Sequence, residues 1–138
     1  MITDATRLLQ LHEGYRRHPY TCSAGKLTVG YGRNLDDVGI DQEEAEWLLE
    51  RDIERARAAL RLEPYWLDLG EVRQAVLLDM AVNMGWPRLQ TFQRMRQALR
   101  MSEYHRAAAE MVDSAWYEQV GQRSRRLVEM MRTGEWPE

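Results

Sequence analysis

The chain has 138 residues, of which 44% are hydrophobic and 30% are charged, and its formal net charge is -3. This length and composition predict one soluble globular domain, and the small negative charge gives no pull toward nucleic acid or anionic membranes. The single cysteine excludes an internal disulfide, no stretch is long enough for a membrane span, and no signal peptide is visible at the N-terminus.

The N-terminal part predicts a short helix followed by a hairpin. Residues 4–12 are expected to form the helix because their leucines fit one helical face. Residues 13–40 contain glycines that break any helical pattern, and their Tyr, Thr and Val residues suit short strands around a turn. This stretch is the one place where a carboxylate (Glu13), a thiol (Cys22) and a hydroxyl (Thr28) are expected to converge beside a groove.

A long helix is predicted over residues 41–61. Asp41 suits the N-cap, and Glu44 three residues later completes a pattern like a capping box. Apolar residues follow at helical spacing, and charged residues fill the other faces. At 1.5 Å per residue the helix is about 30 Å long, which suits a connection between two lobes. The Glu63-Pro64 step ends it.

The rest of the chain predicts a bundle of helices. Residues 70–84 are apolar nearly all round, as in a buried helix, and Gly85-Trp86-Pro87 ends that helix. Ser102 is the predicted N-cap of a later helix. The further helices are expected at 90–100, 103–113, 115–120 and 122–132.

Together these elements predict an α+β fold that is mainly helical and has two lobes within a single domain, 1–138. The small lobe covers about 13–40, the connecting helix about 41–62, and the helical lobe about 63–138 together with 1–12. Ligand sites tend to lie in grooves between lobes, and the hairpin would form one wall of such a groove.

Glu13 is the first candidate for a chemical role. At the C-terminal end of a helix, the negative end of the helix dipole favours the protonated carboxylic acid, which a glycosidase needs to protonate a leaving oxygen. Each candidate also has a plain structural interpretation. Glu13 suits a surface turn, Cys22 suits an inert buried thiol, and Thr28 is a good strand former.

The spacing of these three residues resembles a known family. Glu13, Cys22 and Thr28, followed by Gly30 and Gly32, match the pattern of the phage-type (T4-like) lysozymes, glycoside hydrolase family 24. The resemblance covers essentially the whole chain and implies a lysozyme-like fold. It extends to Glu44–Asp52, Asn83-Met84-Gly85, Thr91-Phe92, Ala115-Trp116-Tyr117, Arg123, Arg126 and the closing run Arg132–Trp136.

What the resemblance implies is a muramidase that hydrolyses the β-1,4 bond between N-acetylmuramic acid and N-acetylglucosamine in bacterial peptidoglycan, for host cell lysis. Glu13 would be the general acid, and Thr28 and Cys22 would hold and activate the attacking water, which gives inversion. Arg123 would pair with Glu13, although it also suits a solvated surface arginine. The substrate-binding positions implied are Gly30, Gly32, Arg33, Asn83, Phe92 and Arg123.

The chain departs from the family pattern in two places. Cys22 replaces the commoner aspartate, and a thiol with an unperturbed pKa of about 8.5 needs local help to act as a base. We hypothesise that alkylation of Cys22 inhibits the enzyme; full activity after complete modification would remove Cys22 from the mechanism. The segment 33–40 is shorter than in larger members, and Arg33 stands where the best-known member has histidine.

Two other functions compete with hydrolysis. A lytic transglycosylase cleaves the same bond with one glutamate and no activated water, and it gives 1,6-anhydromuramic acid in place of reducing ends. A non-catalytic peptidoglycan-binding or virion module would keep the fold alone, but the presence of both Glu13 and Thr28 argues against it.

The sequence predicts no cofactor and no metal. His12, His18 and His105 share no ligand spacing, and Cys22 lacks a metal-binding pattern. The expected partner is the peptidoglycan substrate, without nucleic acid or stable membrane insertion, and the family implies a monomer. Without a signal peptide, the protein is expected to stay in the host cytoplasm until a holin releases it to the cell wall.

Overall fold

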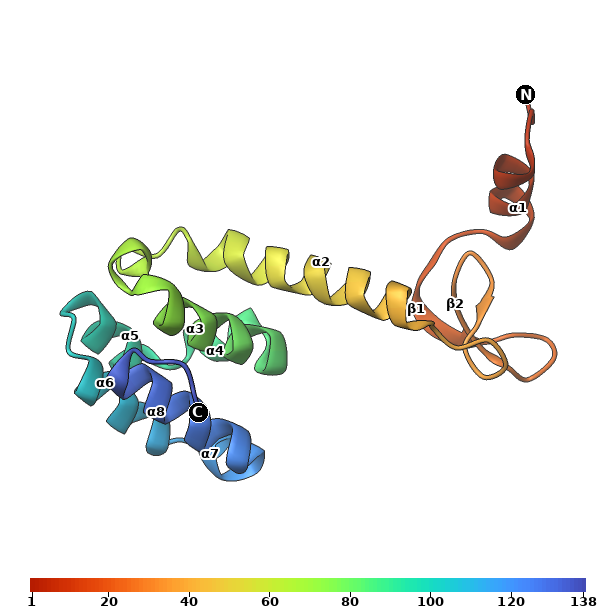
Figure 1. The fold of residues 1–138 in the computed structure, drawn as a ribbon. Coiled ribbons are helices and arrows are strands. Elements are labelled where there is room, and N and C mark those ends of the chain that lie inside the picture. Colours follow the sequence, from red (N-terminus) through yellow and green to blue (C-terminus); the bar gives the residue numbers. More distant parts are fainter. The chain divides into compact units, whose positions relative to one another are not determined.

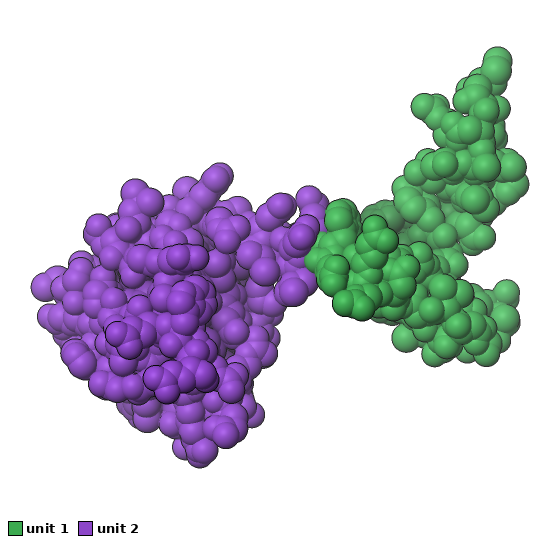
Figure 2. Space-filling view, in the orientation of Figure 1, with its two compact units in different colours: residues 1–48 green, residues 49–138 purple.

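The computed structural model describes residues 1–138 and contains eight α-helices, one short 3-10 helix and a three-stranded antiparallel sheet (Figure 1). The α+β, mainly helical, lysozyme-like class predicted from the sequence is therefore confirmed. Two compact units are present, residues 1–48 (the sheet unit) and residues 49–138 (the helical unit) (Figure 2). None of the helices combines the length and the apolarity that a membrane-spanning helix needs.

The sheet unit begins with α1 (Ala5–Glu13) and contains β1 (Arg16–Thr21), β2 (Leu27–Gly30) and β3 (Arg33–Asn34), which pair in the order β1-β2-β3. The predicted helix and hairpin are confirmed, and the short β3 is an addition to the hairpin. No residue of α1 is buried within the structure, and the assignment of residues 1–12 to the helical lobe stays a prediction.

Helix α2 (Gln42–Leu60) begins in the sheet unit and includes the boundary between the two units. Its start is the predicted capping box: the backbone N–H of Glu44 donates to the Asp41 carboxylate at 2.8 Å, and the Asp41 N–H donates to the Glu44 carboxylate at 3.1 Å. The local sequence therefore determines where this helix begins, as predicted.

The helical unit contains the hydrophobic core. Its elements after α2 are η1 (Trp66–Asp68), α3 (Gly70–Met84), α4 (Trp86–Gln90), α5 (Gln93–Arg100), α6 (Tyr104–Val112), α7 (Ala115–Val120) and α8 (Gln122–Thr133). Val76, Leu77 and Met80 of α3 are completely buried. The predicted helix over 70–84 and its burial are both confirmed, because a helix that is apolar nearly all round must be covered by its neighbours.

Two details of this unit differ from the prediction. The helix expected at 90–100 is present as α5, which begins at Gln93, but the sequence analysis missed α4, which begins directly after α3 because Gly85-Trp86-Pro87 places a proline in the first turn of a new helix. Ser102 does not cap α6: its φ is +55°, its N–H donates to the carbonyl of Leu99, and Glu103 occupies the N-cap position. A residue in this left-handed conformation ends α5 and cannot also serve as the extended N-cap of the next helix.

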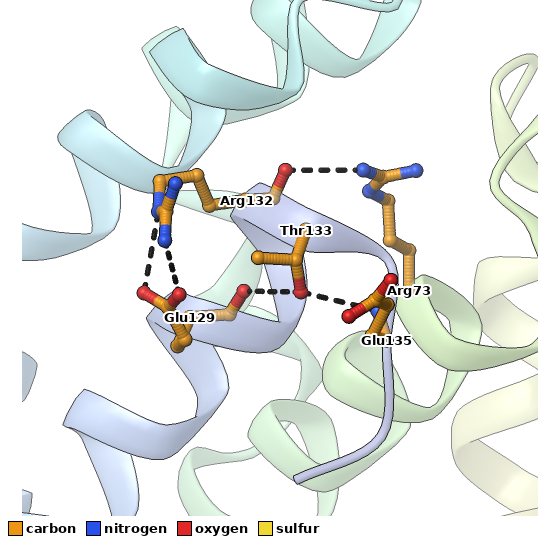
Figure 3. A network of polar contacts seen from close by, with 5 residues as sticks. All are labelled: Arg73, Glu129, Arg132, Thr133 and Glu135. Atoms are coloured by element: carbon orange, nitrogen blue, oxygen red, sulfur yellow. Dashed lines mark hydrogen bonds and ion pairs between the residues drawn. The ribbon is translucent and has the colours of Figure 1, made fainter.

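The C-terminal end of α8 is held by Arg73 of α3 (Figure 3). The Arg73 guanidinium donates to the carbonyl of Arg132 at 3.2 Å, the contact drawn in Figure 3. It also donates to the carbonyl of Met131 at 2.7 Å. Both carbonyls are among the groups that a helix end leaves without partners. Gly134 follows in the left-handed conformation, and a Cβ there would lie 3.0 Å from Arg73. These contacts explain why glycine suits the closing run of the sequence.

Candidate active site

Glu13 is the last residue of α1, and the local sequence determines its position. The Asp4 carboxylate accepts a hydrogen bond from the backbone N–H of Arg7 at 2.9 Å, which starts the helix. Gly14 ends it: its φ is +69°, and its N–H donates to the carbonyl of Gln10 at 3.0 Å. The predicted place of Glu13 at the C-terminal end of a helix is confirmed.

The Glu13 carboxyl group lies against Gly32, which follows β2 in the turn to β3. A Cβ added at Gly32 would clash with Oε2 of Glu13, so one of the two groups would have to move. Gly32 also has a φ of +76°, a conformation that favours glycine. Glycine at this position therefore lets the carboxyl group approach the sheet.

Cys22 and Thr28 lie together at the turn between β1 and β2. The Cys22 N–H donates to the Lys26 carbonyl at 2.9 Å, and Gly25 donates back to the Cys22 carbonyl at 2.9 Å. Thr28 pairs with Tyr20 on one side and Asn34 on the other, and its hydroxyl donates to the Lys26 carbonyl at 2.9 Å. Thr28 is the one buried residue of the sheet unit, with 4% exposure.

The surroundings of Cys22 lower the pKa of its thiol below its ordinary value. The backbone N–H groups of Lys26 and then Ala24 cause most of this by hydrogen bonding to the thiolate, burial opposes it, and the Thr28 hydroxyl adds a smaller contribution. The turn therefore supplies the local help that a thiol base needs, and it does so with backbone groups.

Strand β2 links these two places. Thr28 lies near the start of β2, and Gly30, its last residue, pairs with Arg16 at the start of β1. Gly30 has a φ of +68° and open space around it, unlike Gly32. One short sheet thus carries the thiol and hydroxyl near one end and receives the Glu13 carboxyl group beyond the other.

Arg33 of β3 is engaged within the sheet unit. Its guanidinium pairs with the Glu44 carboxylate at 2.5 Å and donates to the Gly39 carbonyl at 3.1 Å. The hydrogen bond from Arg33 lowers the pKa of Glu44 to about 2, and the same contact raises the pKa of Arg33. These contacts connect β3 to the first turn of α2, and a role for Arg33 in substrate binding stays a prediction.

The other predicted site residues belong to the helical unit, where Trp116 connects two of them. The Trp116 indole N–H donates to the Asn83 side-chain oxygen at 3.1 Å, and its ring meets Phe92 edge to face with centroids 6.3 Å apart. Phe92 and Trp116 line an open cavity of about 480 Å³. Arg123 pairs with Asp79 at 2.8 Å, and its predicted pairing with Glu13 stays a prediction.

Trp116 is the residue that the sequence analysis missed. It belongs to the Ala115-Trp116-Tyr117 run quoted for the family resemblance, so a signal was present, but the run itself indicates no contact. No group of three or more His, Cys, Asp or Glu side chains is placed to hold a metal ion.

Comparison with known proteins decides the family. The family model described as phage lysozyme matches residues 10–133, which include every candidate residue named above. The chain belongs to the phage lysozyme family. This lysozyme is a glycoside hydrolase, and its substrate is peptidoglycan.

Curated relatives agree with this assignment. The lysozyme is 31% identical to an endolysin of Acyrthosiphon pisum secondary endosymbiont phage 1, over 76% of the chain and 73% of the relative. It is 23% identical to probable T4-type lysozyme 1 of Dictyostelium discoideum, over 97% and 96% of the two chains. It is also 30% identical to the pre-baseplate central spike protein of Enterobacteria phage T4, over 92% of this chain but only 27% of that protein.

Proposed function

We propose that this lysozyme is an inverting muramidase that hydrolyses the β-1,4 bond between N-acetylmuramic acid and N-acetylglucosamine. The observation that supports this most is the approach of the Glu13 carboxyl group to Gly32, on the same small sheet that carries Cys22 and Thr28. An inverting glycosidase requires an acid and, on the opposite face of the sugar, a group that activates water; Glu13 is our candidate for the first role, and Cys22 with Thr28 for the second.

In the proposed reaction, protonated Glu13 gives its proton to the glycosidic oxygen as the bond from that oxygen to the anomeric carbon breaks. A water held by Thr28 and Cys22 attacks the anomeric carbon from the opposite face, and its proton passes to the Cys22 thiolate. Glu13 and Cys22 then exchange protons with solvent to restore their starting states. The lowered pKa of Cys22 supports this role, because it makes more thiolate available near neutral pH.

The substrate-binding roles of Gly30, Gly32, Arg33, Asn83, Phe92 and Arg123 are part of the same proposal. Gly32 acts by giving the Glu13 carboxyl group room. Phe92 and Asn83 act beside Trp116 in the helical unit. We also propose that the chain is a single domain with two lobes. Residues 13–40 form the small lobe, and residues 63–138 together with 1–12 form the helical lobe.

The proposed biological role is host cell lysis by a monomer that stays in the host cytoplasm until release and then acts on the wall. The similarity to a protein named endolysin supports this role. The similarity to a central spike protein favours a second candidate, a virion-associated enzyme that opens the wall during infection. Detection of the chain in purified virions would select the second role, and its absence there with lysis from within would select the first.

The test of the general acid is Glu13→Gln, assayed on purified peptidoglycan by mass spectrometry of the released muropeptides. The wild-type enzyme is expected to give reducing ends, and the variant to lose about 10²- to 10⁴-fold in rate, because the amide cannot donate the proton. Products ending in 1,6-anhydromuramic acid would instead show that the enzyme is a lytic transglycosylase. We keep this alternative because Cys22 stands where the family commonly has the aspartate that activates water. Undiminished activity of the variant would overturn the assignment of Glu13.

The test of Cys22 compares alkylation of the wild-type enzyme with the variants Cys22→Asp and Cys22→Ala. Alkylation and Cys22→Ala are expected to lower the rate about 10²-fold or more by removing the base, whereas Cys22→Asp keeps activity because a carboxylate can replace the thiolate. The alkylating reagent applied to Cys22→Asp is the control. Equal activity of Cys22→Ala and wild type would exclude Cys22 from the reaction.

A further inference from the structure

Two tyrosines form an exposed aromatic surface beside Glu13. The rings of Tyr15 and Tyr31 have centroids 5.8 Å apart and planes tilted by 50°, and the two residues are 64% and 51% exposed. Aromatic rings placed side by side usually bury much of their area, so two neighbouring exposed rings at a fixed geometry need an explanation.

The backbone determines the position of this surface relative to the carboxyl group. Tyr15 follows Glu13 by two residues, and Tyr31 lies between Gly30 and Gly32, the glycine that the Glu13 carboxyl group approaches. The pairing of Arg16 with Gly30 brings the two tyrosine-bearing segments together. The aromatic surface and the carboxyl group are therefore fixed to the same edge of the sheet unit.

The third tyrosine of the sheet unit, Tyr20, has a different environment. The Arg16 guanidinium lies over the Tyr20 ring, 4.4 Å from its centroid, and Tyr20 is half-buried. Tyr20 is thus occupied by a partner from its own strand. Among the three tyrosines of the sheet unit, Tyr15 and Tyr31 are the two whose rings are exposed.

We propose that Tyr15 and Tyr31 form a binding subsite for one N-acetylhexosamine ring next to the bond that Glu13 protonates, an inference that rests on the proposed function. The C–H groups of a pyranose ring form an apolar face that packs on aromatic rings, and the tyrosine hydroxyl groups can bond to the sugar's polar rim. Binding at this subsite holds the sugar chain on the enzyme equally before and during the reaction, so it contributes affinity.

The experiment measures binding of the tetrasaccharide of alternating N-acetylglucosamine and N-acetylmuramic acid, without peptide, to the full chain carrying Glu13→Gln. Adding Tyr31→Ala or Tyr15→Ala is expected to weaken binding about tenfold, whereas Tyr31→Phe and Tyr15→Phe retain most of the affinity. Val38→Ala, which removes another exposed side chain of the sheet unit, is the control and is expected to bind as the parent does. Circular dichroism confirms that each variant is folded.

The kinetic readout separates binding from chemistry. On the Glu13 background, the alanine variants are expected to raise KM about tenfold and to change kcat little, because the tyrosines bind the sugar and do not transfer protons. Alanine variants with unchanged affinity and KM, in an enzyme that cleaves the oligosaccharide, would overturn the subsite and leave the proposed function standing. A parent protein that neither binds nor cleaves the oligosaccharide would overturn the proposed function itself.

Discussion

The two units are stabilised in different ways. The helical unit buries a cluster of apolar side chains that extends from Ala56 to Met131, whereas the sheet unit buries only Thr28. The sheet unit lacks such a core and is stabilised by backbone hydrogen bonds between its strands, by turns at glycines with positive φ, and by ion pairs such as Arg33 with Glu44. Side-chain packing specifies the helical unit, and backbone geometry specifies the sheet unit.

This difference matters because the proposed chemistry lies on the unit without a core. Glu13, Cys22 and Thr28 are positioned by a helix end, a tight turn and a four-residue strand. Segments with few buried apolar contacts open at lower free energy than core elements. We therefore expect mutations to affect stability mainly in the helical unit and activity mainly in the sheet unit.

The largest expected effect on stability comes from the core. Leu77→Ala in α3 removes a completely buried side chain and is expected to lower the free energy of unfolding by about 2–5 kcal/mol, through lost burial and the cavity left behind. Leu67→Ala is the matched control, because Leu67 is 88% exposed and its truncation is expected to change stability by less than about 0.5 kcal/mol. If urea unfolding showed that the two variants lose the same unfolding free energy, the described core would be contradicted.

The next effect separates activity from stability in the sheet unit. Gly32→Ala and Gly30→Ala both place a side chain at positive φ, and each is expected to cost about 1–2 kcal/mol in stability. Only Gly32→Ala meets the Glu13 carboxyl group, which must then move. We expect Gly32→Ala to lose about 10²-fold more activity than Gly30→Ala. Equal activity of the two variants would show that the contact with Glu13 has no functional consequence.

The smallest expected effect on stability comes from the ion pair between Arg33 of β3 and Glu44 of α2. The pKa of Glu44 is lowered from 4.5 to about 2 by Arg33, so the pair stabilises the folded state fully above pH 4.5 and loses that effect as the pH falls toward 2. The difference in unfolding free energy between wild type and Glu44→Gln is expected to shrink over this range. Glu43→Gln, in the same helical turn, is the control. A difference that does not depend on pH would contradict the assigned pair.

The parts of the fold that local sequence determines were predictable. The capping box at Asp41 and the apolar pattern of 70–84 gave the starts and ends of α2 and α3 within a residue or two. The break between α4 and α5 and the left-handed Ser102 were not predictable, because each depends on how the chain turns between packed helices. Periodicity carries information about helix faces and little about such turns.

In the candidate site, too, the features that local sequence determines were predictable and the contacts between distant segments were not. The spacing of Glu13, Cys22 and Thr28 identified the family, but it indicated neither the approach of Glu13 to Gly32 nor the backbone groups that lower the pKa of Cys22. The contact of Trp116 with Asn83 joins helices that are distant in sequence, so no local pattern reveals it. Distances between segments come from tertiary structure, which a single sequence does not state.

The configuration of the sugar that the enzyme releases tests the proposed inverting reaction most directly. Proton NMR recorded within the first moments of cleavage of a soluble peptidoglycan oligosaccharide distinguishes the α-anomer from the β-anomer before they interconvert. We expect the α-anomer as the first product, because in the proposed reaction water attacks the anomeric carbon from the face opposite to the leaving oxygen that Glu13 protonates. A β-anomer, or a 1,6-anhydro end, would contradict the proposed role of a water held by Thr28 and Cys22.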